Sequence, residues 1–144
     1  MSNDELAEQL LLIDALAQTA FTITSALNRI AADNDLSLTQ LRMLGVLRGR
    51  RPHMSDLASH LGLERSTLSG LIARAERRGV VGRGTSATDG RAVEVYLTAT
   101  GEVLAERIQE EVRAAVLPDI AGIAAEDRGE LRKLLEQLLG PSRL

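Results

Sequence analysis

The sequence has no cysteine and almost no aromatic residues. Its 144 residues include one phenylalanine, one tyrosine and no tryptophan. Without cysteine, the chain can form neither a disulfide framework nor a thiolate metal site, and it has no thiol-based redox switch. Because aromatic side chains are so few, the core must be built from leucine, isoleucine, valine and alanine. That composition favours packed helices over a β-sandwich.

The sequence also lacks the usual marks of a membrane or exported protein. No cationic N-terminal region precedes a long apolar run, and no apolar stretch is expected to approach the roughly 20 residues that span a bilayer. A chain of this length is expected to form a single domain, residues 1–144, with its own core. We therefore expect a cytoplasmic protein with no membrane partner.

Charge is distributed unevenly along the chain, although the net charge is only −3. Residues 42–91 contain ten arginines and four acidic residues, a net charge of +6, whereas the remainder carries −9. This asymmetry predicts a basic surface on an acidic body, and a basic surface attracts phosphate. Taken alone, the pattern is equally consistent with an arginine-rich surface that contacts only solvent.

The helical pattern of the central region predicts a helix-turn-helix. Ser37 and Gln40 resemble a capping box at the start of a helix that ends near Arg48. Ser55 is expected to cap the next short helix, and Gly62 to supply the turn that follows it, where a positive φ costs glycine little. The next helix is expected over residues 65–78.

A β-hairpin is predicted directly after this helix-turn-helix. One strand begins at Val80 and Val81, and the alternating Val93, Val95 and Leu97 form its partner, with a loop of about eight residues between them. A helix-turn-helix followed by a hairpin places one helix in the major groove of DNA and a loop near the flanking backbone or minor groove. The order of elements in residues 54–98 therefore predicts DNA binding.

The helix at residues 65–78 has one face suited to DNA. Its apolar stripe, which contains Leu68 and Ile72, is expected to pack inward, and the opposite face is short of acidic residues. Gly70 costs roughly 1 kcal/mol relative to alanine inside a helix, which a close approach to DNA would explain. Serine, threonine and arginine can bind phosphates or base edges. An ordinary amphipathic surface helix is the alternative. The residues expected to contact DNA are Arg65, Ser66, Thr67, Ser69, Gly70, Arg74 and Arg77.

The predicted hairpin adds three charged candidates for DNA binding, Arg83, Asp89 and Arg91. An arginine at a loop tip can enter a narrow minor groove, where the potential is most negative. Asp89 has the wrong charge for phosphate, so we expect it to hold Arg91 or the loop backbone through a charge-assisted hydrogen bond. A polar turn with incidental charges is the alternative.

Long helices are expected at both ends of the chain. Residues 4–32 carry an apolar stripe at alternating spacings of four and three, with further apolar residues beside it. A helix is also expected from Thr98 to about residue 116, since Pro118 then breaks or bends it. A last helix is expected over residues 126–139. This much apolar surface indicates a homodimer, with a monomeric core as the alternative. The expected interface residues are Leu6, Leu10, Ile13, Leu131, Leu134 and Leu138.

The central motifs occur together in the stretch LERSTLSGLIARAERRGVVGR…TDGRAVEVYLTATG. They are the helix-turn-helix, the Asp-x-Arg of Asp89 and Arg91, and the Leu97-Thr98 pair followed by Gly101. Together they resemble the signature of the MarR family of bacterial transcriptional regulators, and the expected helices match over nearly the whole chain. The resemblance implies a mainly α fold with a small β-wing. It places a winged helix-turn-helix at residues 36–98, with dimerisation helices at residues 1–35 and 99–144.

The same resemblance implies a homodimer that binds palindromic operators in double-stranded DNA, usually as a repressor, with Arg91 as the wing arginine. It also implies a pocket for a small-molecule effector between the dimerisation helices and the DNA-binding region. Two residues depart from the family pattern. Gly70 stands where a polar or basic residue often contacts DNA, and Ala75 stands where a larger aliphatic residue is usual.

No catalytic arrangement or cofactor site emerges from the sequence. His53 and His60 have no clear third ligand nearby, so surface histidines are favoured over a metal site. No glycine-rich phosphate loop follows a strand, and no set of Ser, His and Asp suggests a nucleophile. The primary hypothesis is a DNA-binding regulator that is not an enzyme and needs no cofactor. The alternative is a winged-helix module that binds a protein partner.

Overall fold

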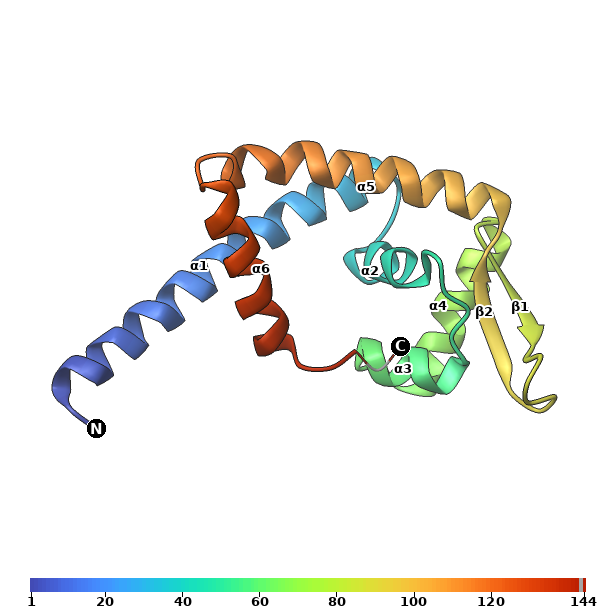
Figure 1. Ribbon diagram of the computed structural model, residues 1–144. Helices are drawn as coiled ribbons and strands as arrows, with labels where there is room; N and C mark the ends of the chain where they lie inside the picture. The colour runs from blue at the N-terminus through green and yellow to red at the C-terminus, as the bar shows by residue number, and fades with distance from the viewer. Residues whose placement is uncertain (143) are drawn as a thin grey trace.

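The computed structural model describes residues 1–142 and 144, which form six α-helices and one two-stranded antiparallel sheet (Figure 1). The elements in chain order are α1 (Asn3–Asp33), α2 (Leu38–Leu47), α3 (Met54–Leu61), α4 (Arg65–Arg77), β1 (Val81–Thr85), β2 (Val93–Leu97), α5 (Ala99–Ile120) and α6 (Ala125–Leu139). The predicted fold class, mainly α with a small β-wing, is confirmed.

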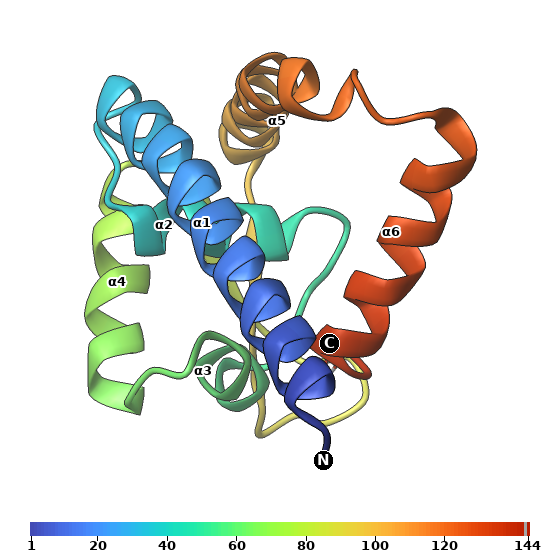
Figure 2. The same cartoon turned by 90° about the vertical axis from the view of Figure 1, so that its left-hand side faces the viewer.

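The helix-turn-helix and the hairpin lie together on one side of α5, which runs along the top of the molecule in Figure 1. The C-terminal part of α1 packs beside α5, whereas its N-terminal half projects away from the body (Figures 1 and 2). We call residues 36–98 the winged-helix region, and α1, α5 and α6 the terminal helices.

The core lies where the winged-helix region packs on α5 and the end of α1. The four apolar residues expected to face inward from α4, which are Leu68, Leu71, Ile72 and Ala75, are all buried. The largest fully buried side chains are aliphatic or methionine and come from α2, α3, α4 and β2: Met43, Leu44, Leu47, Leu57, Leu68, Ile72 and Val95. Packing on this core sets which face of α4 points outward.

Local signals determine several helix ends as predicted. Ser37 and Gln40 form a capping box, in which Ser37 Oγ accepts from Gln40 N at 3.1 Å and Gln40 Oε1 accepts from Ser37 N at 2.8 Å. Gly62 ends α3 in the left-handed conformation, with φ 66°.

Two predicted boundaries are wrong. The N-cap of α3 is His53 rather than Ser55, because His53 is held extended by a β-bridge to Glu94. Pro118 does not end α5, which continues to Ile120. It lies in the exposed last turn, where the missing N–H removes one hydrogen bond near a helix end that solvent can satisfy.

By length and composition, helix α1 could cross a membrane. Its 31 residues include an 18-residue window with a mean hydropathy of 1.6, of which 6% is buried in this chain. The expectation that no apolar stretch reaches this length is therefore wrong. Polar residues interrupt its surface, among them Gln18, whose Nε2 donates to Asp14 Oδ2 at 2.8 Å.

The Leu97-Thr98 motif joins β2 to α5 at a close contact with the end of α4. Thr98 Oγ1 donates to Gly79 O at 2.6 Å and accepts from Gly101 N at 3.1 Å, and Thr98 N donates to Val80 O at 3.1 Å. Gly101 is buried, and a Cβ at this position would lie 1.9 Å from Val80 O. A glycine is therefore required for α5 to begin where it does.

Gly101→Ala should lower the free energy of unfolding by about 3 kcal/mol, because the methyl group forces α5 away from Val80 and disturbs the core beneath it. Urea denaturation measures this change. Gly45→Ala is the control, since Gly45 lies inside α2 with open space around its Cβ position, and it should be neutral or stabilising by up to about 1 kcal/mol. Equal stability of the two variants would contradict the predicted contact.

Candidate nucleic-acid interface

The outward face of α4 presents the polar residues that the sequence predicted. Six of the seven candidates on this helix are exposed, and Gly70 is half-buried. Arg74 folds back over Gly70, so that its Nη1 lies 3.7 Å from the position a Cβ would take. The glycine therefore leaves room for the Arg74 guanidinium over the middle of the face, and other arginines lie at both ends of the helix.

The ten arginines of residues 42–91 fall into two groups. In half of them, the guanidinium donates hydrogen bonds to backbone carbonyls or carboxylates of the protein: Arg42, Arg50, Arg51, Arg78 and Arg83. In the other half, the guanidinium group makes no hydrogen bond or ion pair with described residues: Arg48, Arg65, Arg74, Arg77 and Arg91. Four of these five lie on α4 or in the loop between the strands, where their guanidinium groups remain available for phosphates or base edges.

A groove of about 440 Å³ separates the N-terminal half of α4 from the hairpin. Polar groups from both elements line it, together with two apolar side chains: Met54, Arg65, Ser66, Ser69, Arg83 and Val93. A nucleic-acid backbone in this groove would contact the helix and the hairpin at once.

Arg83 joins the hairpin to α4. Its Nε and Nη2 lie 2.8 and 2.6 Å from Glu76 Oε1, and both side chains are partly exposed. Because this guanidinium is already paired with Glu76, its role in the free protein is to hold β1 against α4. The sequence placed Arg83 among the DNA contacts and did not anticipate its pairing with Glu76.

Ser86 organises the loop between the strands, residues 86–92. It is 5% exposed, and its Oγ accepts from the backbone N–H groups of Thr88 at 3.3 Å and Asp89 at 3.2 Å. His53 Nε2 lies 3.3 Å from the same oxygen. This buried hydroxyl therefore attaches the loop to the start of α3.

Asp89 shapes the tip of the loop. Its Oδ1 accepts from the backbone N–H of Arg91 at 3.1 Å. The sequence predicted that Asp89 holds either Arg91 or the loop backbone, and the hydrogen bond goes to the backbone. The Arg91 backbone is thus fixed, whereas its guanidinium makes no hydrogen bond or ion pair with described residues.

The opposite face of the hairpin is braced by Arg51. Its Nε lies 3.2 Å from Glu94 Oε2, and its Cζ lies 4.2 Å from the centre of the Tyr96 ring. The hydrogen bond from Arg51 lowers the pKa of the Glu94 carboxyl below its ordinary value, and bonds from Ser86 and the backbone of Ala87 act in the same direction. The hairpin is therefore held on both faces.

Tyr96 depends on the glycine opposite it. Gly82 pairs with Tyr96 in the sheet, and a Cβ on Gly82 would lie 2.7 Å from the ring. Sequence reasoning missed Arg51, Ser86 and Tyr96. A signal for Tyr96 existed, because Gly82 and Gly84 occupy alternate positions of β1 and leave one face of the strand without side chains.

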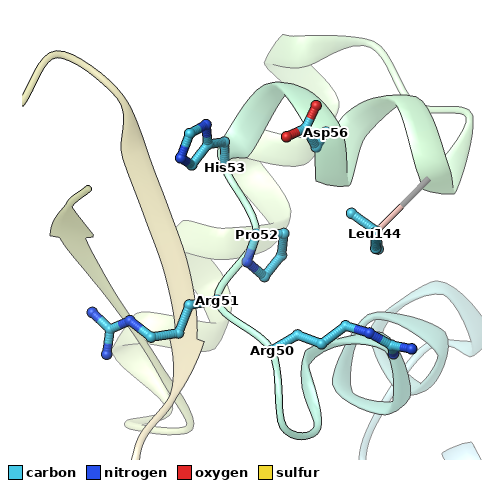
Figure 3. A pocket seen from close by; sticks show the side chains of 6 residues that line it. All are labelled: Arg50, Arg51, Pro52, His53, Asp56 and Leu144. Atoms are coloured by element: carbon cyan, nitrogen blue, oxygen red, sulfur yellow. The ribbon is translucent and has the colours of Figure 1, made fainter. Parts of the chain in front are cut away.

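A shallow pocket of about 400 Å³ lies beside Arg51, but its charged groups do not converge (Figure 3). Arg51 points toward the hairpin and Arg50 points the opposite way, with His53 and Asp56 at the far side. The described residues contain no group of three His, Asp or Glu side chains that could hold a metal ion.

A more apolar pocket of about 230 Å³ lies between α1, α2 and α5. Arg42, Arg48 and Gln109 contribute polar groups to its wall. The rest of the wall is mainly aliphatic: Leu27, Leu41, Leu44, Ala105, Ile108 and Val112. The Arg42 guanidinium donates to the carbonyls of His60 and Leu61, whereas the Arg48 guanidinium makes no hydrogen bond or ion pair with described residues.

The terminal helices expose the six apolar residues that the sequence predicted for an interface. Each is between 40% and 65% exposed: Leu6, Leu10, Ile13, Leu131, Leu134 and Leu138. Helix α6 has no buried residue. Phe21, Val103 and Leu139 add further exposed apolar surface on the same helices. Apolar surface this extensive is typical of a protein interface.

The chain is similar to known proteins over most of its length. Residues 34–92 match the MarR family model. The homoprotocatechuate degradative operon repressor of Escherichia coli is 32% identical over 133 residues, which cover 90% of this chain and 89% of that protein. An HTH-type transcriptional repressor of Mycobacterium tuberculosis is 33% identical over 98 residues, which cover 68% of this chain and 69% of that protein.

Solved structures agree with these sequence matches. NadR in complex with 4-hydroxyphenylacetate is 29% identical and superposes with a TM-score of 0.76 over 86% of this chain and 89% of that one. A MarR family regulator from Silicibacter pomeroyi, 21% identical, gives a TM-score of 0.80 over 96% and 94% of the two chains and shows the fold alone. With the winged helix, the full-length relatives and the family match in agreement, this chain belongs to the MarR family of DNA-binding transcriptional regulators.

Proposed function

We propose that this regulator is a cytoplasmic, homodimeric repressor that inserts α4 into the major groove and the loop between β1 and β2 (residues 86–92, the wing loop) into the adjacent minor groove. One observation carries the proposal. The guanidinium groups of Arg65, Arg74, Arg77 and Arg91 make no hydrogen bond or ion pair within the described chain, and they lie on the two elements that a winged helix-turn-helix turns toward DNA. The repressor names of two relatives support the direction of regulation.

Selection from a library of random-sequence duplexes tests this proposal. The wild-type protein should recover a palindrome whose half-sites lie about one helical turn apart. Its affinity for the selected duplex should fall linearly with salt on a logarithmic plot, because bound arginines release counterions from phosphates. A protein-interaction module, the alternative reading, would recover no shared sequence and show no such dependence. Membership of the MarR family favours DNA binding.

The wing loop provides a prediction that separates shape from charge. Asp89→Ala should weaken binding to the selected duplex by up to about tenfold, because it removes the acceptor that fixes the Arg91 backbone. Asp89→Asn is the matched variant, since it makes the same change in charge and keeps an oxygen at Oδ1. It should bind within about twofold of wild type if one acceptor suffices.

Titrations at several salt concentrations measure these effects. Arg91→Ala should weaken binding and reduce the salt slope by about one, as expected for the loss of one phosphate contact. A generic basic loop predicts instead that both Asp89 variants bind more tightly, because each removes a negative charge near DNA. Tighter binding by Asp89→Ala in a folded protein would contradict the shaped wing.

We further propose that a small aromatic carboxylate binds in the pocket between α1, α2 and α5 and acts as the effector. NadR, a relative of the same fold, is bound to 4-hydroxyphenylacetate. The pocket here combines an aliphatic wall with Arg48, a cation that makes no hydrogen bond or ion pair with described residues. An apolar pocket with one placed charge suits an aromatic acid.

Arg48→Ala tests the effector site. Calorimetric titration with 4-hydroxyphenylacetate should show binding to wild type that is about tenfold weaker in Arg48→Ala, the expected loss of one charge-assisted hydrogen bond. Affinity for the selected duplex without ligand should stay within about twofold. Equal ligand binding by both proteins, or by neither, would reject this site and leave the DNA-binding proposal untouched.

A further inference from the structure

Asn34, the residue that caps the C-terminus of α1, uses both ends of its side-chain amide. It is 5% exposed. Its Nδ2 donates to Ile30 O at 2.8 Å and to Glu111 Oε2 at 2.9 Å. Its Oδ1 accepts from Arg107 Nε at 3.2 Å and Nη2 at 2.9 Å. The amide therefore lies between the cation and the anion of an i, i+4 pair on α5.

The backbone carbonyls of Asn34 and Asp35 bind the C-terminal end of α4. Arg78, the C-cap of α4, donates from Nη2 to Asn34 O at 2.6 Å and from Nη1 to Asp35 O at 2.9 Å. Its guanidinium is thus committed to protein carbonyls, unlike those of Arg74 and Arg77. Three elements meet at Asn34: the end of α1, the middle of α5 and the end of α4.

We infer that this contact, which we call the Asn34 link (Asn34, Arg78, Arg107 and Glu111), positions α4 relative to α5 and so contributes to operator affinity. The inference rests on the proposed dimer. A dimer reads two half-sites at a fixed spacing, so the orientation of each α4 relative to its terminal helices matters. Charge-assisted hydrogen bonds are strong and directional, and a buried amide that loses its partners is left unsatisfied. None of the four residues needs to touch DNA.

A double-mutant cycle on DNA affinity tests this positioning role. Arg107→Ala and Arg78→Ala should each weaken binding to the selected duplex by about tenfold relative to wild type. The double variant should also be weakened by only about tenfold relative to wild type, because both substitutions break the same Asn34 link. The salt slope should stay at the wild-type value, since no phosphate contact is lost. Arg107→Lys, which can keep one hydrogen bond to Asn34 Oδ1, should restore part of the affinity.

Arg113→Ala is the matched control on the same helix. Arg113 pairs with Glu110 on the exposed surface of α5, away from Asn34, so its removal should leave affinity within about twofold. Purely additive effects of Arg107→Ala and Arg78→Ala would overturn the inference. A salt slope reduced by about one in Arg78→Ala would also overturn it, because that result assigns Arg78 to a phosphate contact.

Hydrogen exchange in the absence of DNA provides a second measurement. Amides of residues 74–80, at the end of α4, should exchange faster in Arg107→Ala than in wild type and at the wild-type rate in Arg113→Ala. Within the described chain, the Arg107 guanidinium donates to Asn34, and Asn34 in turn accepts from Arg78, so Arg107 is connected to this segment through Asn34. Unchanged exchange would reject the link. If wild type selected no duplex, the proposed function would fail, and exchange would still decide whether α5 positions α4.

Discussion

Leu10→Glu should convert the protein from a dimer to a monomer and weaken its binding to the selected duplex by at least about a hundredfold. Leu10 lies on the exposed apolar stripe of α1, so the substitution costs little within one chain but places a charge in the proposed interface. A monomer contacts one half-site and loses the gain from simultaneous engagement of both, which is about 10² to 10⁴. Sedimentation at micromolar concentration and duplex titration measure the two effects.

Gln9→Glu is the matched control, because it adds the same charge one position away on an exposed face of α1. It should remain dimeric and bind DNA like wild type. A well-folded monomeric wild-type protein at micromolar concentration would contradict the proposed interface. Co-sedimentation of wild type with lipid vesicles would identify a bilayer, rather than a second copy, as the cover for α1.

Combined replacement of Arg74 and Arg77 by alanine should weaken binding to the selected duplex by about a hundredfold or more, since each contact contributes about 1–3 kcal/mol. The guanidinium groups of these two arginines make no hydrogen bond or ion pair with described residues, so their loss leaves the fold intact while removing cations from α4. The salt slope should fall by about two if both bind phosphates.

The control is the pair Arg113→Ala and Arg132→Ala, which changes the net charge equally at exposed ion pairs on α5 and α6. It should leave affinity within a few-fold of wild type, because charges beyond a Debye length of about 10 Å from DNA are screened. Equal weakening by the two double variants would show that net charge, rather than the face of α4, determines binding.

The helices and strands were largely predictable because their signals are local. The Ser37 and Gln40 cap, the turn at Gly62 and the apolar stripe of α4 each depend on residues within a few positions of one another. The two wrong boundaries show where local signals no longer suffice to predict a helix end. His53 starts α3 because a bridge to Glu94, forty-one positions away, holds it extended, and Pro118 is tolerated because the last turn of α5 is exposed.

The candidate interface was predicted as a set of residues but not as an arrangement. Sequence patterns identified a basic segment with ten arginines and placed seven candidates on one helix. They could not show that Arg83 binds Glu76, that Arg51 braces Tyr96, or that Arg78 binds the carbonyls of Asn34 and Asp35. Each of these contacts joins elements whose proximity depends on how the helices pack.

The sequence by itself determined the element order, the buried stripe of α4, the basic character of residues 42–91 and the apolar surface of the terminal helices, because periodicity and charge are properties of the chain. Only the tertiary structure decided which arginines are engaged and which remain available to DNA. A guanidinium is engaged when an acid or carbonyl oxygen lies within hydrogen-bonding distance. For Arg51 and Arg78, those partners are 43 or more positions away and are brought near by the core.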